Sequence, residues 1–302
     1  MPAFEGPLVE VRALEVAYGS VRAVRGVDLS VPDGQVLALV GPNGAGKSSV
    51  INSLLGLRRP SAGRIRIAGL PPRAAVRSGY VGAMQQAAGL PSGARVMEVL
   101  RLAAALHKDG PRPSELAELA GLDGLARRDV ATLSGGQAQR LRFAIAVAGR
   151  PRLLFLDEPT AAMDVQSRQH FWRALRAKAD AGTTVLFATH YLEEAHDFAD
   201  RIVVISAGRL VADGTAGELK AGAELGQTVE VTAEDPEAIE ALVLPDVTEV
   251  TVHGRTVRLR TDDADGTVRR LYESGIAFHG LSVTGEHLDD VLLALTAPDE
   301  ER

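Results

Sequence analysis

Residues 36–57 read VLALVGPNGAGKSSVINSLLGL, and this stretch decides the fold class. It opens with a continuous apolar run over 36–40, which is typical of a strand buried on both faces of a parallel sheet. A glycine-rich loop follows at 41–46, and the apolar residues beyond it recur at helical spacing, which predicts a helix over 49–57. A strand, a glycine loop and a helix in this order indicate an α/β fold with a phosphate-binding loop.

The loop matches the pattern G-x-x-x-x-G-K-[ST] from Gly41 to Ser48. Glycines let backbone N–H groups turn inward, and the N-terminus of the following helix adds a positive dipole end. Lys47 would neutralise charge on the β- and γ-phosphates of ATP, and the Ser48 hydroxyl would ligate Mg²⁺. The alternative is an ordinary glycine turn, but the flanking strand and helix favour nucleotide binding. The predicted nucleotide-binding positions are Gly41, Pro42, Asn43, Gly44, Ala45, Gly46, Lys47, Ser48 and Ser49.

A second apolar run, Leu153–Leu156, predicts another buried strand, and two adjacent carboxylates, Asp157 and Glu158, follow it directly. Ligands of open α/β sheets bind at the carboxyl ends of the strands. Neighbouring side chains of a strand point apart, so the two acids are expected to have different roles. Asp157 would reach Mg²⁺ through its water shell, and Glu158 would orient and polarise the attacking water. The alternative is a solvated acidic turn before Pro159, which the phosphate loop makes less favourable.

Residues 133–137 read LSGGQ and lie between these two motifs. Taken alone, Ser134 could cap the helix predicted after it. The pentapeptide also resembles the signature motif of the ATP-binding-cassette (ABC) family, and it stands where that family requires it. The resemblance implies a second anion cradle, which contacts the γ-phosphate bound to the opposite subunit. Its residues are Ser134, Gly135, Gly136 and Gln137.

The resemblance assigns further positions around the nucleotide. Tyr18 stands where an aromatic side chain stacks on adenine, although a tyrosine at the end of a strand is the alternative. His190 follows Ala188-Thr189 at the end of a predicted strand and resembles the switch histidine that contacts the γ-phosphate. Ala162-Met163-Asp164 resembles the D-loop, with methionine in place of the more usual leucine.

The glutamine of the Q-loop is less clearly marked. The segment 83–86, AMQQ, lacks the usual proline and offers two glutamines. Gln86 is preferred, because the distance to Val96–Leu100 then fits the family's spacing, and the resemblance implies that it contacts Mg²⁺ and the attacking water. Gln85 stays open as the alternative. The acidic pair Glu193-Glu194 is expected on a solvated helix face.

The expected fold is an α/β P-loop cassette of the ABC type over residues 8–219. The resemblance implies a mixed, mostly parallel sheet with an antiparallel β subdomain and a helical insertion at about 90–132. Residues 220–302 are expected to form a small α+β C-terminal domain, with elements in the ferredoxin-like order βαββαβ and a last helix over 287–295. Together with the segment 286–291, EHLDDV, this domain resembles the drug- and antibiotic-exporter branch typified by daunorubicin-resistance ATPases.

Composition limits the partners of the chain. A formal net charge of −6 over 302 residues argues against binding dominated by phosphate backbones, so no nucleic acid partner is expected. The absence of cysteine excludes disulfides and thiolate metal sites. No apolar run approaches the roughly 18 residues that cross a bilayer, and the N-terminus lacks the order of a signal peptide. The chain is therefore expected to be cytoplasmic and to reach the inner face of the cell membrane through a partner.

The resemblance implies ATP hydrolysis in a head-to-tail dimer of two copies, or of one copy and a paralogous cassette. A separate transmembrane permease would export a drug, an antibiotic or another amphipathic substrate. An importer ATPase would share every catalytic motif and is the first alternative. A soluble ABC protein acting on ribosomes would normally carry two cassettes, and a chromosome-maintenance ATPase would carry a long coiled coil between Lys47 and Asp157. A nucleotide-binding regulator without turnover is disfavoured, because Glu158 and His190 are both present.

Overall fold

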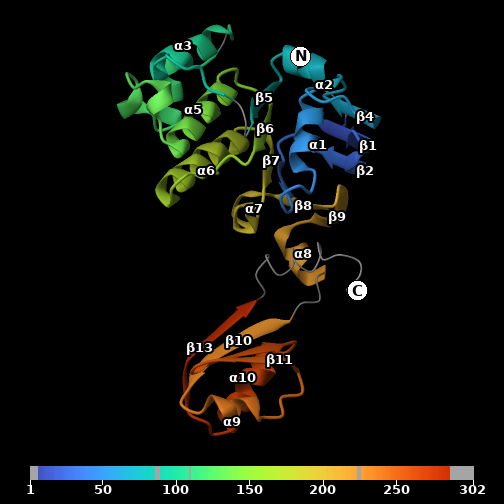
Figure 1. The fold of residues 1–302 in the computed structure, drawn as a ribbon, viewed down its shortest axis with the longest axis vertical. Helices are drawn as coiled ribbons and strands as arrows, with labels where there is room; N and C mark the ends of the chain where they lie inside the picture. The colour runs from blue at the N-terminus through green and yellow to red at the C-terminus, as the bar shows by residue number, and fades with distance from the viewer. Residues whose placement is uncertain (1–5, 86–88, 109, 223–225, 286–302) are drawn as a thin grey trace. The chain divides into compact units, whose positions relative to one another are not determined.

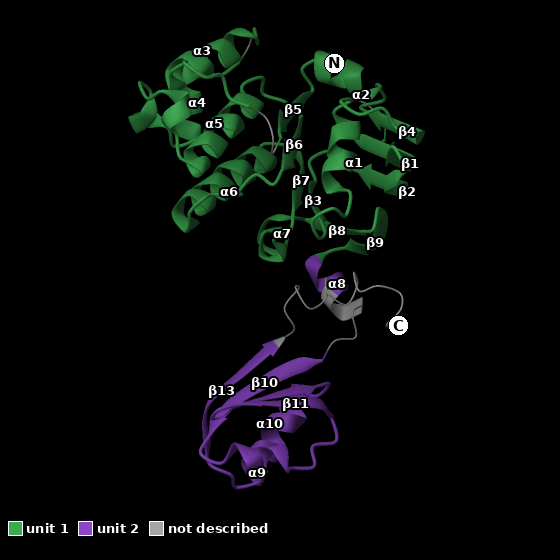
Figure 2. Cartoon of the chain, in the orientation of Figure 1, with its two compact units in different colours: residues 1–215 green, residues 216–302 purple. Residues whose placement is uncertain are grey.

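The computed structural model describes residues 6–85, 89–108, 110–222 and 226–285 (Figure 1). The chain divides into two compact units, residues 1–215 and 216–302, which Figure 2 shows in different colours. Within the described ranges, no helix is both long enough and apolar enough to cross a bilayer.

A six-stranded sheet forms the centre of the first unit. Strands β5, β6, β7, β3 and β8 are neighbours in this order and pair in parallel, while β9 at the edge pairs antiparallel with β8. In spatial order the strands are β5 (Val81–Met84), β6 (Leu153–Asp157), β7 (Thr184–Thr189), β3 (Val36–Val40), β8 (Arg201–Ser206) and β9 (Arg209–Gly214). Every residue of β3 and β6 is buried, as the two apolar runs predict. The carboxyl ends of β3, β6 and β7 meet at one edge of this sheet, which positions the site.

A three-stranded antiparallel sheet packs over one face of the central sheet. Its strands are β1 (Val9–Tyr18), β2 (Val21–Val31) and β4 (Ala62–Ile67), in the order β2-β1-β4. Its apolar side chains share one buried cluster with α1 (Lys47–Leu54) and with alternate residues of β3, such as Leu37 and Leu39. The antiparallel β subdomain implied by the resemblance is therefore present.

Helix α1 departs from its predicted range at both ends. It begins at Lys47 because Gly46 takes the N-cap position, and it ends at Leu54 because Gly56 adopts a φ of 69°, the left-handed conformation that terminates helices. The spacing of apolar residues marks the buried face of a helix and not its caps. The predicted range 49–57 was therefore wrong by two residues at the start and three at the end.

Helices cover the other face of the central sheet (Figure 1). The predicted helical insertion contains α3 (Val96–Ala105) and α4 (Pro113–Leu119), which both contact α5 (Gly135–Val147). Short 3₁₀ turns lie at Asp123–Leu125 and Val130–Thr132. Next in the chain come α6 (Val165–Asp180) and α7 (Leu192–Phe198), while α2 (Pro72–Arg77) leads into β5.

The second unit begins with α8 (Ala216–Gly222) and continues as a four-stranded antiparallel sheet with two helices. The elements are β10 (Gln227–Ala233), α9 (Pro236–Glu240), β11 (Val247–His253), β12 (Thr256–Thr261), α10 (Ala264–Glu273) and β13 (Phe278–Gly285). The sheet order is β11-β12-β10-β13, so each βαβ pair has a strand of the other pair between its own strands. Apolar residues of β10 and β12 form a core with α9 and α10. The helix predicted over 287–295 lies outside the described residues.

Candidate functional site

The phosphate loop joins β3 to α1 and packs tightly on neighbouring backbone. A Cβ at Gly41 would lie 2.1 Å from the carbonyl oxygen of Ile205, and a Cβ at Gly46 would lie 2.4 Å from that of Ala23. Gly44 and Gly46 also adopt φ values of 81° and 112°, which side chains rarely tolerate. These positions therefore need glycine for the path of the loop, in addition to any contact with phosphate.

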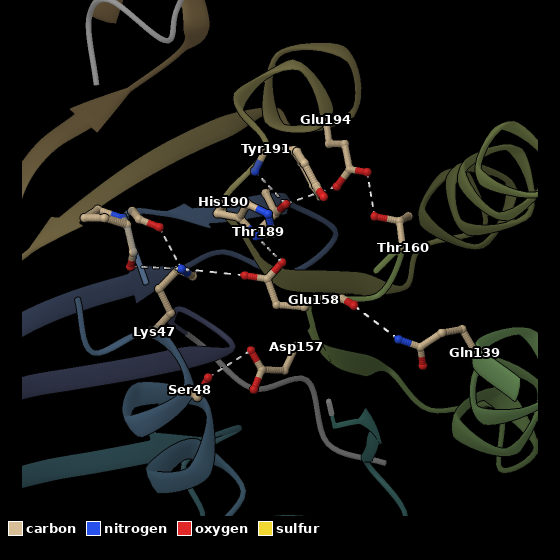
Figure 3. A network of polar contacts seen from close by, with 12 residues as sticks. Lys47, Ser48, Gln139, Asp157, Glu158, Thr160, Thr189, His190, Tyr191 and Glu194 are labelled. Carbon is tan, nitrogen blue, oxygen red and sulfur yellow. Dashed lines mark hydrogen bonds and ion pairs between the residues drawn. The ribbon is translucent and has the colours of Figure 1, made fainter. Parts of the chain in front are cut away.

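Lys47 holds its ammonium group at the centre of this loop (Figure 3). Its Nζ donates to the carbonyl oxygens of Gly41 at 2.6 Å and Pro42 at 3.2 Å, and it lies 3.6 Å from Glu158 Oε1. The side chain is buried, and a buried charge needs compensation of this kind. Phosphate oxygens could replace the carbonyls as partners, because an ammonium group is a compact charge with three donors.

Ser48 and Asp157 form a pair of oxygen donors beside the loop. The Ser48 hydroxyl donates to Asp157 Oδ1 at 3.2 Å. Burial raises the pKa of Asp157 above its ordinary 3.8, the neighbouring Glu158 raises it further, and the Ser48 bond opposes both. A hydroxyl and a buried carboxylate whose charge lacks full compensation suit a hard cation such as Mg²⁺, which keeps several waters. The two side chains therefore fit the predicted metal site.

Glu158 points away from Asp157, toward Lys47 and His190 (Figure 3). His190 Nδ1 donates to Glu158 Oε2 at 2.8 Å, and the backbone N–H of Glu158 donates to the carbonyl oxygen of Ala188 at 2.9 Å. Glu158 is 6% exposed and adopts a φ of 50°, a conformation that costs about 1–3 kcal/mol for residues other than glycine. The structure thus brings Glu158 and His190, two of the three side chains predicted to be catalytic, into direct contact.

A cavity of about 300 Å³ opens between these groups. Of the predicted residues, Asn43, Gly44, Gly46, Lys47, Ser48, Ser49, Glu158 and His190 line it. Residues 134–137 do not contribute to this lining within the described part of the chain. Within the described residues, one copy of the chain therefore brings the phosphate loop, Glu158 and His190 together around the cavity, whereas the signature residues 134–137 lie outside its lining.

Tyr18 ends β1 beside the loop, and its hydroxyl accepts from Ser49 Oγ at 3.5 Å. Tyr18 is 44% exposed, and the Arg58 guanidinium lies 4.3 Å from the centroid of its ring. Arg58 also donates to the carbonyl oxygen of Ala17, so it holds the tyrosine from one side. Sequence reasoning missed Arg58, because no motif links it to Tyr18.

The signature residues cap helix α5. The backbone N–H of Gln137 donates to Ser134 Oγ at 3.3 Å, and the backbone N–H of Ser134 donates to Gln137 Oε1 at 3.1 Å. The capping role that the sequence leaves open is thus present, and it does not exclude an anion cradle at the same exposed helix N-terminus. Next to it, the D-loop residue Ala162 has its carbonyl oxygen 3.2 Å from where a Cβ of Gly136 would lie.

The predicted Gln86 lies outside the described residues. The alternative, Gln85, donates from Nε2 to Asn52 Oδ1 of α1 at 2.9 Å. A third glutamine was missed: Gln139 is buried in α5 and donates to the carbonyl oxygen of Glu158 at 3.4 Å. Its position two residues after the signature motif was the available signal.

The prediction that Glu193-Glu194 forms a solvated helix face was wrong for Glu194. Glu193 is exposed, but Glu194 is 4% exposed and accepts hydrogen bonds from the hydroxyls of Thr160 at 2.5 Å and Thr189 at 3.1 Å. The first turn of α7 directs Glu194 inward, where two threonine hydroxyls replace water. Burial is the largest effect on this carboxyl and raises its pKa above the ordinary 4.5.

Known proteins resemble this chain over nearly its whole length. A family model described as ABC transporter matches residues 24–161. A daunorubicin resistance ATP-binding protein of Streptomyces coeruleorubidus is 38% identical, over 96% of this chain and 96% of that protein. A Nod factor export ATP-binding protein of Rhizobium meliloti is 33% identical, over 95% of this chain and 88% of that protein.

Solved structures agree with the fold of the first unit. A structure described as the ATP-binding subunit of an ABC transporter superposes with a TM-score of 0.66 at 26% identity, over 71% of this chain and 92% of that chain. The dimeric structure of a bacterial ABC transporter cassette superposes with a TM-score of 0.63 at 24% identity, over 68% and 98% respectively. At that identity, the second similarity bears on the fold alone.

Proposed function

The chain belongs to the ATP-binding proteins of ABC transporters, and from that premise we propose that it drives export of an amphipathic, drug-like molecule through a separate permease. The chain is a cassette ATPase. The roles of its residues, its partners and the direction of transport are proposed below. The observation that carries the proposed roles in ATP hydrolysis is the meeting of Lys47, Glu158 and His190 around one cavity at the carboxyl edge of the sheet.

The phosphates of ATP would occupy the loop 41–49. Lys47 would exchange its carbonyl partners for β- and γ-phosphate oxygens, and the N-terminus of α1 would add its dipole. Tyr18 offers a half-exposed ring for the adenine, held from one side by Arg58. This assignment is supported by the cavity beside the loop and by the bond between Tyr18 and Ser49 at the loop's end.

Mg²⁺, when bound, neutralises charge on the phosphate oxygens during transfer to water. Ser48 and Asp157 would hold it, together with Gln86. Glu158 would orient the attacking water and accept its proton, and His190 would contact the γ-phosphate. Because Glu158 bonds His190 directly, one hydrogen-bonded pair can act on the water and on the phosphate at the same time.

The site would be completed by residues 134–137 of a second copy or of a paralogous cassette. Two observations support this: these residues cap an exposed helix end, and the cavity lining in the described chain does not include them. Bound ATP would then bridge both chains and close the dimer. Loss of the γ-phosphate would remove contacts on both sides and let the dimer open.

Export is the direction favoured by the relatives. One is named for daunorubicin resistance and another for Nod factor export, and both similarities extend through the second unit. Dimer closure would then act on a permease at the cytoplasmic face of the cell membrane. An importer ATPase would share the cassette motifs, so the direction has to be measured.

Proteoliposomes in which the ATP-binding chain faces the outer solution test the proposal. The chain is purified from native membranes with its bound permease, both are reconstituted, and uptake of daunorubicin into the vesicles is followed with and without ATP. ATP-dependent uptake that is absent in a Glu158→Gln complex supports export. ATP-dependent loss of a preloaded solute would favour import, and co-purification of ribosomes in place of a permease would contradict a transport role.

A further inference from the structure

Glu194 is a buried carboxylate for which the proposed mechanism has no use. It lies in the first turn of α7, while Leu192 and Ala195 of the same helix are buried apolar residues. Burying a carboxylate is unfavourable unless hydrogen bonds compensate it, and an apolar side chain would fill the space without that requirement. The presence of the carboxylate therefore calls for a reason other than packing.

Two hydroxyl groups donate to Glu194, one from Thr160 in the loop after β6 and one from Thr189, the last residue of β7 (Figure 3). Thr160 Oγ1 donates to Oε1 at 2.5 Å, and Thr189 Oγ1 donates to Oε2 at 3.1 Å. Thr160 lies two residues after Glu158, and Thr189 directly precedes His190. A single carboxylate thus ties together the two loops that carry the hydrolytic pair.

The Thr189 hydroxyl also fixes the backbone around His190. A carboxylate only accepts hydrogen bonds, so the single proton of this hydroxyl points to Glu194. Its oxygen then accepts the backbone N–H of Tyr191 at 3.0 Å. The residues on both sides of His190 are held in this way, and the imidazole keeps its 2.8 Å bond to Glu158.

Helix α6 adds a third contact, from the side of the D-loop. Arg168 Nε lies 3.6 Å from Glu194 Oε1, and its guanidinium carbon lies 5.3 Å from the ring centroid of Tyr191. The Tyr191 ring is in turn 3.9 Å from the His190 ring. The carboxylate therefore stands where α6, the loop after β6 and the loop after β7 meet.

We propose that Glu194 is a positioning residue that holds the segments 158–160 and 189–191 in the geometry that hydrolysis requires. The inference rests on the hydrolytic roles proposed above for Glu158 and His190. Glu194 is not among the residues that line the nucleotide cavity, so it acts through Thr160 and Thr189. Its loss should therefore lower kcat and leave the affinity for ATP nearly unchanged.

Four variants of the full chain test this role. Glu194→Gln keeps the shape and removes the charge, and Glu193→Gln is its matched control on the exposed side of the same helix. Thr189→Val removes the bridging hydroxyl, and Thr189→Ser restores it. Steady-state hydrolysis gives kcat and KM for ATP, and thermal unfolding shows whether each variant is folded at the assay temperature.

Glu194→Gln and Thr189→Val should each lower kcat by about 10- to 100-fold, because small displacements of catalytic groups have effects of this size. KM for ATP should change by less than about threefold in both, and Glu193→Gln and Thr189→Ser should keep wild-type kinetics. A wild-type kcat in folded Glu194→Gln would overturn the positioning role. So would a raised KM with unchanged kcat, or equal losses in Thr189→Val and Thr189→Ser.

Glu158→Gln in the same assay distinguishes the proposed positioning role of Glu194 from the proposed hydrolytic roles of Glu158 and His190. If it loses turnover while Glu194→Gln does not, only the positioning role of Glu194 fails. If Glu158→Gln keeps wild-type turnover, the hydrolytic pair itself is wrongly assigned and the role of Glu194 falls with it.

Discussion

Replacing Glu158 by glutamine should remove turnover and leave the site assembled. Glutamine has nearly the same shape, and its carbonyl oxygen can still accept from His190 Nδ1, which lies 2.8 Å from Oε2 in the wild type. The change removes the negative charge 3.6 Å from Lys47 and the group proposed to accept the proton of the attacking water. Loss of such a base costs about 10²- to 10⁴-fold in rate, or about 3–5 kcal/mol of barrier at about 1.36 kcal/mol per decade.

Binding of ATP should be retained in this variant. A carboxylate repels the γ-phosphate, so its removal should leave the Kd for ATP equal to or below that of the wild type. Phosphate release measures kcat, and equilibrium titration with ATP in the presence of Mg²⁺ measures Kd. The exposed Glu193→Gln variant controls for the loss of one charge. A kcat within about threefold of the wild type would refute the assignment of Glu158, since a general base contributes far more than that.

Three further outcomes are expected. Gly41→Ala should destabilise the first unit by about 1–3 kcal/mol in urea unfolding and weaken ATP binding, because its Cβ would lie 2.1 Å from the Ile205 carbonyl oxygen. The control variant Gly124→Ala has open space around its Cβ and should leave the free energy of unfolding unchanged. Burial raises the pKa of Glu194 above 4.5, so as the pH rises past 4.5 the unfolded chain loses this proton first. The free energy of unfolding of the wild type should then fall relative to that of Glu194→Gln until the folded carboxyl has also ionised. A difference between the unfolding free energies of the two proteins that does not vary with pH would contradict this. A chain that ends at residue 215 should keep its Kd for ATP within about threefold, since the first unit has its own core; complete loss of binding would show that the units depend on each other.

The central strands and the nucleotide edge could be predicted from the sequence for a definite physical reason. A run such as Val36–Val40 has no polar side chain to face water, so it must be buried on both faces, and its carboxyl end must carry the ligand. Asp157 ends such a strand and Glu158 follows it, while Lys47 and Ser48 come after another such strand and the loop 41–46. Their convergence was therefore predictable from local pattern alone.

What the sequence could not predict depends on contacts between distant segments. Charge alone suggests a solvated Glu194, and its burial becomes understandable only beside Thr160, which lies 34 residues earlier in the chain. Strand β4 was not predicted, because its residues Arg64 and Arg66 weaken the apolar alternation; it forms by pairing with β1. Arg58 beside Tyr18 is a further case, since only the fold brings the two together.

The measurement that tests the composite site most directly is the mass of the chain in solution with ATP and Mg²⁺, determined by light scattering in the Glu158→Gln background. The account predicts a shift from 31.8 kDa to twice that mass when ATP is added. It also predicts that Glu158→Gln/Ser134→Arg still binds ATP but stays at 31.8 kDa, because in the proposed dimer Ser134 of one chain would contact the ATP held by the other. A Glu158→Gln chain that remains monomeric with ATP bound would contradict a site shared between two copies of this chain, as would a double variant that dimerises equally well.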